Sequence, residues 1–372
     1  MKIVYVIRSL ALWGGIERIV TDKANWLAGR GHDVLVVTAD QNGHALPYTL
    51  DSRVRLADLD ICFHHQYRYH GMRRLYDRWR RQQLFRQRLA ALIDREQPDV
   101  LVCTASHFVG DLVQVKGSTP LVVESHSLCE QLVDTGHLRL LRRWQKRRQL
   151  RKADVVVALT EGDAKVWRSY VKTVEVIPNM MHEPDSPTTS PLKERRVIFV
   201  GRLEPQKQPL HILEAWKMVM KEQPDWRLSM YGDGSMEEAV RREAAAIGPC
   251  IEVLPPTDRI FEQYAASSVL VLCSQFEPFG LVMAEAMACG VPVVAYDCHY
   301  GPRDIITHGA EGYLVEPDNT DALAQHLTKL MADDNLRRRM GEQAQVSARR
   351  FTAQRVMPLW EQLFSKVAGH QS

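Results

Sequence analysis

Residues 269–292 read VLVLCSQFEPFGLVMAEAMACGVP. The continuous apolar run Val269–Cys273 favours a strand that is buried on both faces of a parallel sheet. A turn follows, and we expect a helix from about Gly280 to Cys289 that stops at Gly290, a residue type suited to a left-handed helix end. In such a unit the free helix N–H groups lie at the carboxyl end of the strand, where open α/β sheets bind ligands.

The same alternation of strand-like runs and helix-length segments continues along the chain. The runs are short, apolar and rich in β-branched residues, and they fall into two successive series. The strands that we expect are Ile3–Ile7, Val34–Thr38, Val100–Cys103, Leu121–Glu124 and Val155–Leu159, then Val197–Val200, Leu228–Tyr231, Ile251–Leu254, Val269–Cys273 and Val293–Tyr296. Two β-α-β series predict an α/β protein with two doubly wound, Rossmann-like domains that face a cleft.

The domain boundary is predicted near residues 178–191, where four prolines stand among Ser, Thr and Asn, a composition typical of a linker. The length of 372 residues suits two domains. We therefore expect an N-terminal domain over 1–177, a C-terminal domain over 192–350, and a last helix within 351–372 that crosses back to the first domain.

Composition indicates an ordered globular protein, with 45% hydrophobic and 25% charged residues. The seven cysteines form no CxxC pair, and we interpret them as reduced core residues rather than as disulfides or zinc ligands. No stretch of about 18 apolar residues is present, so no membrane span is expected. Arg8 interrupts the apolar N-terminus and no small-residue cleavage site follows, which favours a first core strand over a signal peptide. We expect a cytoplasmic protein.

The charge is unevenly distributed between the two halves. Residues 1–177 carry 28 Lys and Arg against 19 Asp and Glu, a net charge of +9, whereas residues 178–372 carry 20 against 26, a net charge of −6. Two basic runs, 73–88 and 139–152, contain interleaved aromatic and leucine residues that suit an anionic membrane surface. Nucleic acid is not an expected partner, because no nucleic-acid-binding module is recognisable.

Two carboxylates and two cations follow strands of the second series. Glu277 lies in the turn after Val269–Cys273 and Glu285 lies eight residues later on the expected helix, so the two can accept hydrogen bonds from sugar hydroxyls at separate points. Arg202 and Lys207 follow the strand that ends at Val200, and two cations in one turn can bind phosphate oxygens. Taken singly, each of these residues also fits an ordinary charged surface position.

The motifs around these residues resemble those of the bacterial group 1 glycosyltransferases, also called glycosyltransferase family 4, which have the GT-B fold. The resemblance spans nearly the whole chain in the right order. It is carried by WGGIER at 13–18, VGRLEPQK at 200–207, SMYGDG at 229–234, FEPFGLVMAE at 276–285, DCHYGPRDII at 297–306 and EGYLVEP at 311–317. Asp304 stands where glutamate is usual in the fifth motif.

The resemblance implies a donor site for a nucleotide sugar. It implies that Arg202 and Lys207 hold the donor diphosphate, that Glu285 holds the ribose hydroxyls and that Glu277 holds the transferred sugar. The backbone N–H groups of Phe279, Gly280 and Leu281 are expected to assist, and Gly14 and Gly15 are expected to let the backbone approach the donor phosphates. His126, in the ESHS sequence 124–127, is expected to contact the transferred sugar; Ser127 stands where the family commonly has aspartate.

The resemblance further implies a retaining enzyme without a settled protein nucleophile and without a bound metal or other cofactor. Its catalytic residues would be Glu277, His126, Arg202 and Lys207, acting by positioning and leaving-group stabilisation. We expect transfer of a hexose or N-acetylhexosamine from a UDP-sugar to a growing surface glycan, such as a lipid-linked oligosaccharide, lipopolysaccharide or capsule, at the inner face of the membrane. A nucleotide-sugar 2-epimerase of the same fold and a catalytically silent sugar-nucleotide-binding protein remain alternatives.

Overall fold

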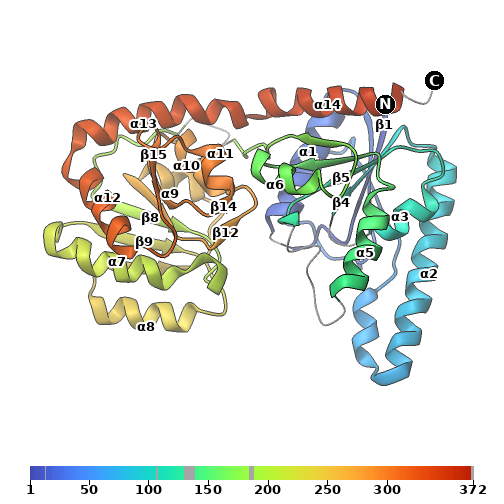
Figure 1. The fold of residues 1–372 in the computed structure, drawn as a ribbon, viewed down its shortest axis with the longest axis horizontal. Helices are drawn as coiled ribbons and strands as arrows, with labels where there is room; N and C mark the ends of the chain where they lie inside the picture. Colours follow the sequence, from blue (N-terminus) through green and yellow to red (C-terminus); the bar gives the residue numbers. More distant parts are fainter. Residues whose placement is uncertain (13, 106–107, 130–138, 184–187, 370–372) are drawn as a thin grey trace. The chain divides into compact units, whose positions relative to one another are not determined.

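The structure is a computed structural model that describes residues 1–12, 14–105, 108–129, 139–183 and 188–369. The chain forms two compact units (Figure 1), one of residues Met1–Ile177 with Val356–Ser372 and one of residues Pro178–Arg355. The predicted linker, 178–191, thus falls within the second unit, and its residues 184–187 lie outside the described part. Residue 13 of the first glycine-rich motif lies outside it too.

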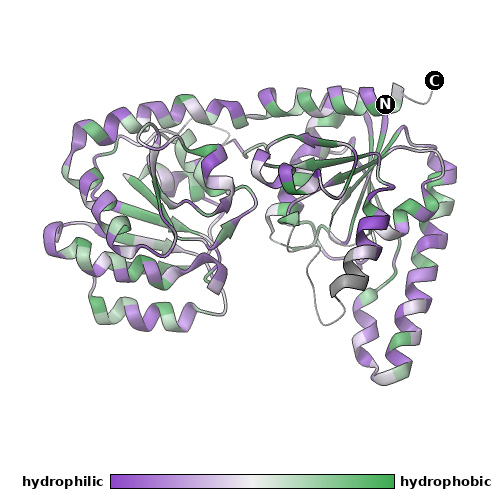
Figure 2. Ribbon diagram, in the orientation of Figure 1, coloured by the Kyte–Doolittle hydropathy of each residue, from purple (hydrophilic) through white to green (hydrophobic). Residues whose placement is uncertain are grey.

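The first unit contains a seven-stranded parallel sheet in the order β3-β2-β1-β4-β5-β6-β7. Its strands are β1 Lys2–Ile7, β2 Asp33–Thr38, β3 Arg55–Asp58, β4 Val100–Thr104, β5 Leu121–Glu124, β6 Val155–Ala158 and β7 Val174–Val176. Its helices are α1 Gly15–Gly29, η1 Phe63–Arg68, α2 Gly71–Glu96, α3 Val109–Val115, α5 Arg139–Leu150, α6 Glu161–Trp167 and α14 Ala353–Gly369. The central strands are apolar throughout because helices cover both faces of the sheet (Figure 2).

The last helix, α14, packs into the first unit from Val356 onward. Its Glu361 lies 2.9 Å from His32 Nε2, and its Lys366 lies 2.8 Å from Glu175. Trp360 is buried, and the ammonium group of Lys23 on α1 lies 3.7 Å from the centre of its ring. A segment from the end of the sequence therefore completes the core of the N-terminal unit.

The second unit has a six-stranded parallel sheet in the order β10-β9-β8-β11-β13-β15, with a separate short pair, β12-β14. Its strands are β8 Arg196–Val200, β9 Arg227–Tyr231, β10 Ile251–Leu254, β11 Val269–Leu272, β12 Phe276–Glu277, β13 Val293–Tyr296, β14 His299–Tyr300 and β15 Gly312–Val315. Its helices are η2 Pro205–Lys207, α7 Pro209–Glu222, α8 Glu237–Ile247, α9 Ile260–Ala265, α10 Leu281–Ala288, α11 Gly301–Ile305, α12 Thr320–Ala332, α13 Asp334–Ala348 and η3 Arg349–Phe351. The prediction of two Rossmann-like α/β domains is confirmed.

The motif at 269–292 folds as strand β11, a turn and helix α10. Gly280 precedes the helix with a φ of +102°, and Gly290 follows it with a φ of +74°. Both backbone conformations favour glycine. The helix therefore begins and ends at the residue types that the sequence provides for these positions. No helix in the described part of the chain combines the length and apolar composition needed to cross a bilayer.

Gly232→Ala is expected to lower the free energy of unfolding of the second unit by about 3 kcal/mol. Gly232 lies in the turn after β9, and a Cβ atom there would lie 1.9 Å from the carbonyl oxygen of Gly201. Gly248→Ala is the matched control, because Gly248 also has a positive φ, +144°, but has open space around it. Backbone strain alone predicts about 1 kcal/mol there. The free energies of unfolding are measured by urea denaturation. If Gly232→Ala and Gly248→Ala lower this free energy equally, the close approach of the Gly232 turn to Gly201 is contradicted.

Candidate functional site

Lys207 and Glu277 form a buried ion pair at the carboxyl edge of the second sheet. Lys207 ends η2, in the loop after β8, and Glu277 lies in β12, in the turn after β11. The Lys207 ammonium contacts Glu277 Oε1, and the Ser274 hydroxyl donates a hydrogen bond of 2.6 Å to the same oxygen. Only 6% of the Glu277 side chain is exposed, and Lys207 supplies the counter-charge that a buried carboxylate requires.

Two further hydrogen bonds fasten these loops together. The Gln206 side-chain amide donates to the carbonyl of Phe276 at 2.7 Å, and the Gln275 N–H donates to the carbonyl of Gln206 at 2.8 Å. The loop after β8 and the turn after β11 therefore form one hydrogen-bonded layer. Two residues for which the sequence predicts different ligand contacts, Lys207 and Glu277, are brought into direct contact.

Arg202 lies in the same loop and is exposed. No carboxylate of the described residues lies within ion-pairing distance of its guanidinium group. Its neighbour Leu203 donates its N–H to the Asp233 carbonyl at 2.6 Å, which ties the loop to the glycine turn after β9. Glu204 accepts hydrogen bonds from Ser235 that, with the Arg202 charge, lower the pKa of Glu204. Arg202 is thus held on a fixed backbone with its cation directed to solvent.

Glu285 faces the protein interior from helix α10. It is buried, and the Tyr264 hydroxyl of α9 donates a hydrogen bond to its Oε2 at 3.2 Å. The alternative that Glu285 is an ordinary solvated helix residue does not fit this burial. Phe279, just before the helix, is also buried and packs edge-on against Phe351 at 5.3 Å between ring centres. Gly280 and Leu281 are half-buried at the start of the helix.

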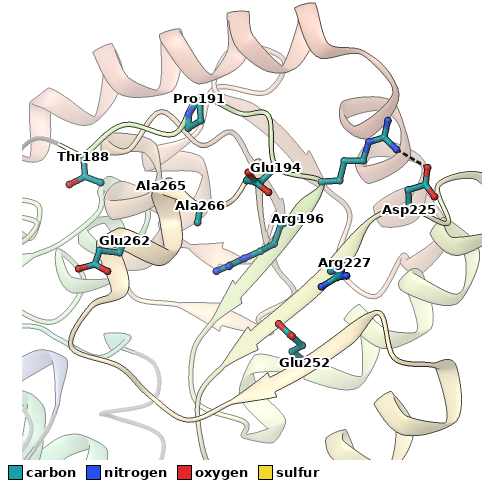
Figure 3. Close-up of a pocket in the computed structure, with 11 residues that line it drawn as sticks. Thr188, Pro191, Glu194, Arg196, Asp225, Arg227, Glu252, Glu262, Ala265 and Ala266 are labelled. Carbon is teal, nitrogen blue, oxygen red and sulfur yellow. Dashed lines mark hydrogen bonds and ion pairs between the residues drawn. The ribbon is translucent and has the colours of Figure 1, made fainter.

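A separate cavity of about 740 Å³ lies elsewhere in the second unit (Figure 3). Its lining includes Arg196, the first residue of β8, and Arg227, the first residue of β9. It therefore lies at the amino ends of these strands, whereas parallel α/β sheets bind ligands at the carboxyl ends. Two ion pairs involve its lining residues, Arg195 with Asp225 at 2.7 Å and Glu262 with Arg259 at 2.8 Å. We therefore place the candidate site at Lys207, Glu277 and Glu285, and not in this cavity.

The glycine motif of the first unit forms the start of helix α1. Gly14 precedes the helix in extended conformation and Gly15 is its first residue. A Cβ atom on Gly14 would lie 2.1 Å from a carboxylate oxygen of Glu17, so the Glu17 side chain folds back over the helix start. Burial raises the pKa of Glu17, opposed by a hydrogen bond from its own backbone N–H and by the nearby His126.

His126 belongs to a buried charged cluster after strand β5. Its Nε2 lies 2.9 Å from Glu124 Oε2, and Lys23 Nζ lies 2.9 Å from the same oxygen. Burial by itself would raise the pKa of Glu124, but the charges and hydrogen bonds of Lys23 and His126 outweigh it and bring this pKa to about 2. Within the described residues, His126 Nδ1 and Glu124 Oε1 have no hydrogen-bond partner. Glu124 therefore fixes the ring of His126 through Nε2 and leaves Nδ1 for another contact.

Several residues of these networks were not predicted from sequence. Ser274 and Tyr264 come from elements whose contacts with Glu277 and Glu285 the sequence does not reveal. The sequence does contain a sign of the Lys23 contact, because Lys23 lies on the buried, apolar face of α1 between Val20 and Leu27. A lysine on an apolar helix face requires a buried anion.

The predicted metal-free chemistry remains a prediction. Within the described ranges, no group of three or more His, Cys, Asp and Glu side chains is arranged to hold a metal ion. The Asp58-Leu-Asp60 sequence has a structural use for its first carboxylate, which accepts hydrogen bonds from Thr38 at 3.1 Å and from the Asn42 N–H at 2.9 Å. The seven cysteines are free thiols.

Lys23→Met is expected to lower the free energy of unfolding by about 3–5 kcal/mol, because it leaves Glu124 buried without its cation. Lys116→Met is the control; its pair with Asp154 is partly exposed and predicts at most about 1 kcal/mol. The measurement is thermal unfolding of both variants.

The deficit of Lys23→Met should also depend on pH. The pKa of Glu124 in the folded protein, about 2, lies below its ordinary value of 4.5, so its pairing stabilises the fold above pH 4.5 and loses this effect as the pH falls toward 2. The gap between wild type and Lys23→Met should therefore narrow in acid. A gap that is constant from pH 7 to pH 3 would contradict the charge argument.

Comparison with known protein families assigns both halves of the chain. The family described as Glycosyltransferase Family 4 matches residues 13–183, and the family described as Glycosyl transferases group 1 matches residues 183–347. An exopolysaccharide phosphotransferase of Streptomyces coelicolor is 33% identical over 282 residues, which are 73% of this chain but only 29% of that protein's length. A Campylobacter jejuni α-1,4-N-acetyl-D-galactosaminyltransferase, named for an acceptor on PP-undecaprenol, is 25% identical over 99% of both chains.

Solved structures share the fold at low sequence identity. Sucrose-phosphate synthase from Thermosynechococcus elongatus superposes with a TM-score of 0.80 at 19% identity, over 99% of both chains. The Anabaena protein HepE, solved with UDP, has a TM-score of 0.77 at 19% identity, over 98% of this chain and 100% of that one. The chain therefore belongs to the group 1 glycosyltransferases, a family of enzymes with the GT-B fold.

Proposed function

We propose that this chain is a retaining glycosyltransferase that moves a hexose or N-acetylhexosamine from a UDP-sugar to a growing surface glycan. The observation that carries the proposal is the cluster of Lys207, Glu277 and Ser274 at the carboxyl edge of the second sheet, with Arg202 and Glu285 on the adjoining loop and helix. Support also comes from relatives named for glycan synthesis and from neighbours of the same fold solved with UDP.

Each charged residue has a distinct task in this proposal. Arg202 and Lys207 bind the diphosphate, whose negative charge grows as the bond to the sugar breaks, and stabilise it as a leaving group. Glu285 accepts hydrogen bonds from the ribose hydroxyls, and Glu277 accepts them from the sugar. Glu277 is held by Lys207 and Ser274, so its carboxylate is already oriented before the donor binds.

The proposed reaction needs no protein nucleophile. The acceptor hydroxyl attacks the face of the sugar from which the diphosphate departs, and a departing phosphate oxygen takes its proton. The protein contributes alignment and a fixed cationic environment. His126, held at Nε2 by Glu124, directs Nδ1 to the transferred sugar. No metal ion is required in this scheme, because Arg202 and Lys207 supply the positive charge.

The acceptor sugar is proposed to bind in the first unit. A cavity of about 510 Å³ lies at the carboxyl ends of β1, β2 and β4, where Ile7, Thr38 and Thr104 end the strands. Its lining combines carboxylates, an amide and imidazoles from Glu17, Asp40, Asn42, His44 and His64. Such groups can hydrogen-bond several sugar hydroxyls at once.

The start of helix α2 is proposed to contact the cytoplasmic face of the membrane. Met72, Leu75, Tyr76 and Trp79 recur at helical spacing and are each more than half exposed, at 81%, 59%, 63% and 57%. In Figure 1 these first turns of α2, in light blue, extend well beyond the sheet of their unit. An exposed apolar stripe flanked by arginines is typical of a helix that lies in the membrane interface. In the second basic run, the side chains of residues 139–143 lie outside the described part.

UDP is expected to bind more tightly than GDP or ADP in calorimetry. Glu285→Ala should weaken UDP binding roughly 10- to 100-fold, because one or two hydrogen bonds to a charged group are lost.

Arg202→Ala should lower kcat by roughly 10²–10³-fold through loss of leaving-group stabilisation. Arg195→Ala is the control, since Arg195 is an exposed arginine at the opposite end of β8. An unchanged kcat in Arg202→Ala would contradict the assigned role.

The product distinguishes the competing functions. A retaining transferase gives a new glycosidic bond with the anomeric configuration of the donor, measurable from the coupling constant of the anomeric proton. A UDP-sugar inverted at C2, formed without an acceptor and without net release of UDP, would instead support a 2-epimerase. UDP binding without turnover on any acceptor would support a silent binding protein. An inverted product would contradict the retaining mechanism.

Replacing Met72, Leu75, Tyr76 and Trp79 together with serine is expected to abolish most sedimentation with vesicles that contain anionic lipid. The control replaces Val346 and Leu359, which are also exposed apolar residues but lie on α13 and α14. The four-residue variant should keep its affinity for UDP. Equal sedimentation of both variants and the wild type would exclude α2 as the membrane contact.

A further inference from the structure

A second cavity of the first unit, of about 290 Å³, lies where η1, helix α2 and the start of α3 meet. Three arginines line it, Arg8 from the end of β1 and Arg74 and Arg78 from α2. Arg74 and Arg78 are one helical turn apart, so both side chains leave the same face of α2. The cavity is therefore bordered by a row of guanidinium groups.

The positive charge of this cavity is not cancelled by its own acidic residue. Asp111 is buried in the lining, but it is already paired with Arg86 at 2.6 Å and accepts a hydrogen bond from Gln82 at 3.1 Å. Across the described ranges, no carboxylate lies within ion-pairing distance of Arg74 or Arg78. Arg74 stacks on the ring of Tyr67, with its guanidinium carbon 4.6 Å from the ring centre, which limits its freedom before any anion binds.

The arginine cavity adjoins the proposed acceptor cavity. Arg8 lines both of them, and it is shared between the two because its Nε lies 3.2 Å from Asp40, a residue of the acceptor cavity. An acceptor sugar among Glu17, Asp40 and His64 would therefore present the group that it carries to Arg74 and Arg78. Guanidinium groups match phosphate oxygens in geometry as well as in charge.

We infer that the acceptor carries a phosphate or diphosphate group, and that Arg74 and Arg78 bind this group beside the accepting sugar. The inference rests on the proposed function, because it assumes that the adjoining cavity holds the acceptor. It also accounts for the apolar stripe of Met72, Leu75, Tyr76 and Trp79 on a neighbouring face of the same helix, since a phosphate that joins a sugar to a lipid lies at the level where headgroups meet hydrocarbon.

The first experiment measures binding of inorganic pyrophosphate by calorimetry, with saturating UDP present to occupy the donor site. Arg74→Gln/Arg78→Gln should weaken pyrophosphate at least tenfold. Arg73→Gln/Arg80→Gln removes the same charge from other faces of α2 and should change the affinity less than twofold. Equal weakening in both variants, or no binding to the wild type, would overturn the inference. Thermal unfolding of both variants checks that each remains folded.

The second experiment uses two acceptors that differ only in the linkage, a short-chain alkyl diphosphate N-acetylhexosamine and the alkyl glycoside of the same sugar. Arg74→Gln/Arg78→Gln should raise KM at least tenfold for the diphosphate acceptor, without vesicles, and leave KM for the glycoside unchanged. If the arginines instead bind phospholipid headgroups, the variant differs from wild type only when vesicles are present, and the inference fails. If the wild type transfers sugar to neither acceptor but binds pyrophosphate through Arg74 and Arg78, the proposed function fails and the anion site stands.

Discussion

A carboxylate buried at the end of a parallel sheet needs a cation nearby, and this constraint organises the second unit. Glu277 is fixed between Lys207 and Ser274, and the flanking Gln206 and Gln275 bonds hold the two loops in one layer. Because the charges are already compensated, the loops can keep their positions before a ligand arrives. If Arg202 and Lys207 bind the donor diphosphate, as we propose, these groups need little rearrangement, which is the property that electrostatic catalysis requires.

The first unit also contains a buried carboxylate with a cation beside it, and there the pair orients a histidine. Glu124 is buried after β5, and Lys23 compensates its charge while resting on the ring of Trp360. Trp360 belongs to α14, so the final helix of the chain takes part in a network that begins with α1 and ends at His126. The orientation of His126 therefore depends on residues that lie far apart in the sequence. A substitution at Trp360 in α14 can alter it through Lys23 and Glu124, although Trp360 is not itself a partner of His126 in this network.

Most of the fold could be predicted, because parallel strands that are buried on both faces appear in the sequence as short continuous apolar runs. The apolar runs found the central strands of both sheets, and the glycines at 280 and 290 set the limits of α10. Five strands were not predicted: the sheet-edge strands β3, β7 and β15, and the short separate pair β12 and β14. Strands β3 and β7 are incompletely buried, and a short run such as Val174–Val176 does not stand out from a loop. The positions of Glu277 and Glu285 follow from their motif, whereas their partners Ser274 and Tyr264 depend on contacts that a sequence does not display.

The most direct test of the donor site is a crystal structure of the protein with UDP. We expect diphosphate oxygens within hydrogen-bonding distance of Arg202 and Lys207, and ribose hydroxyls on Glu285, at the carboxyl edge of β8 and β11. UDP bound instead in the cavity of Arg195, Arg196 and Arg227, at the amino ends of β8 and β9, would contradict this expectation.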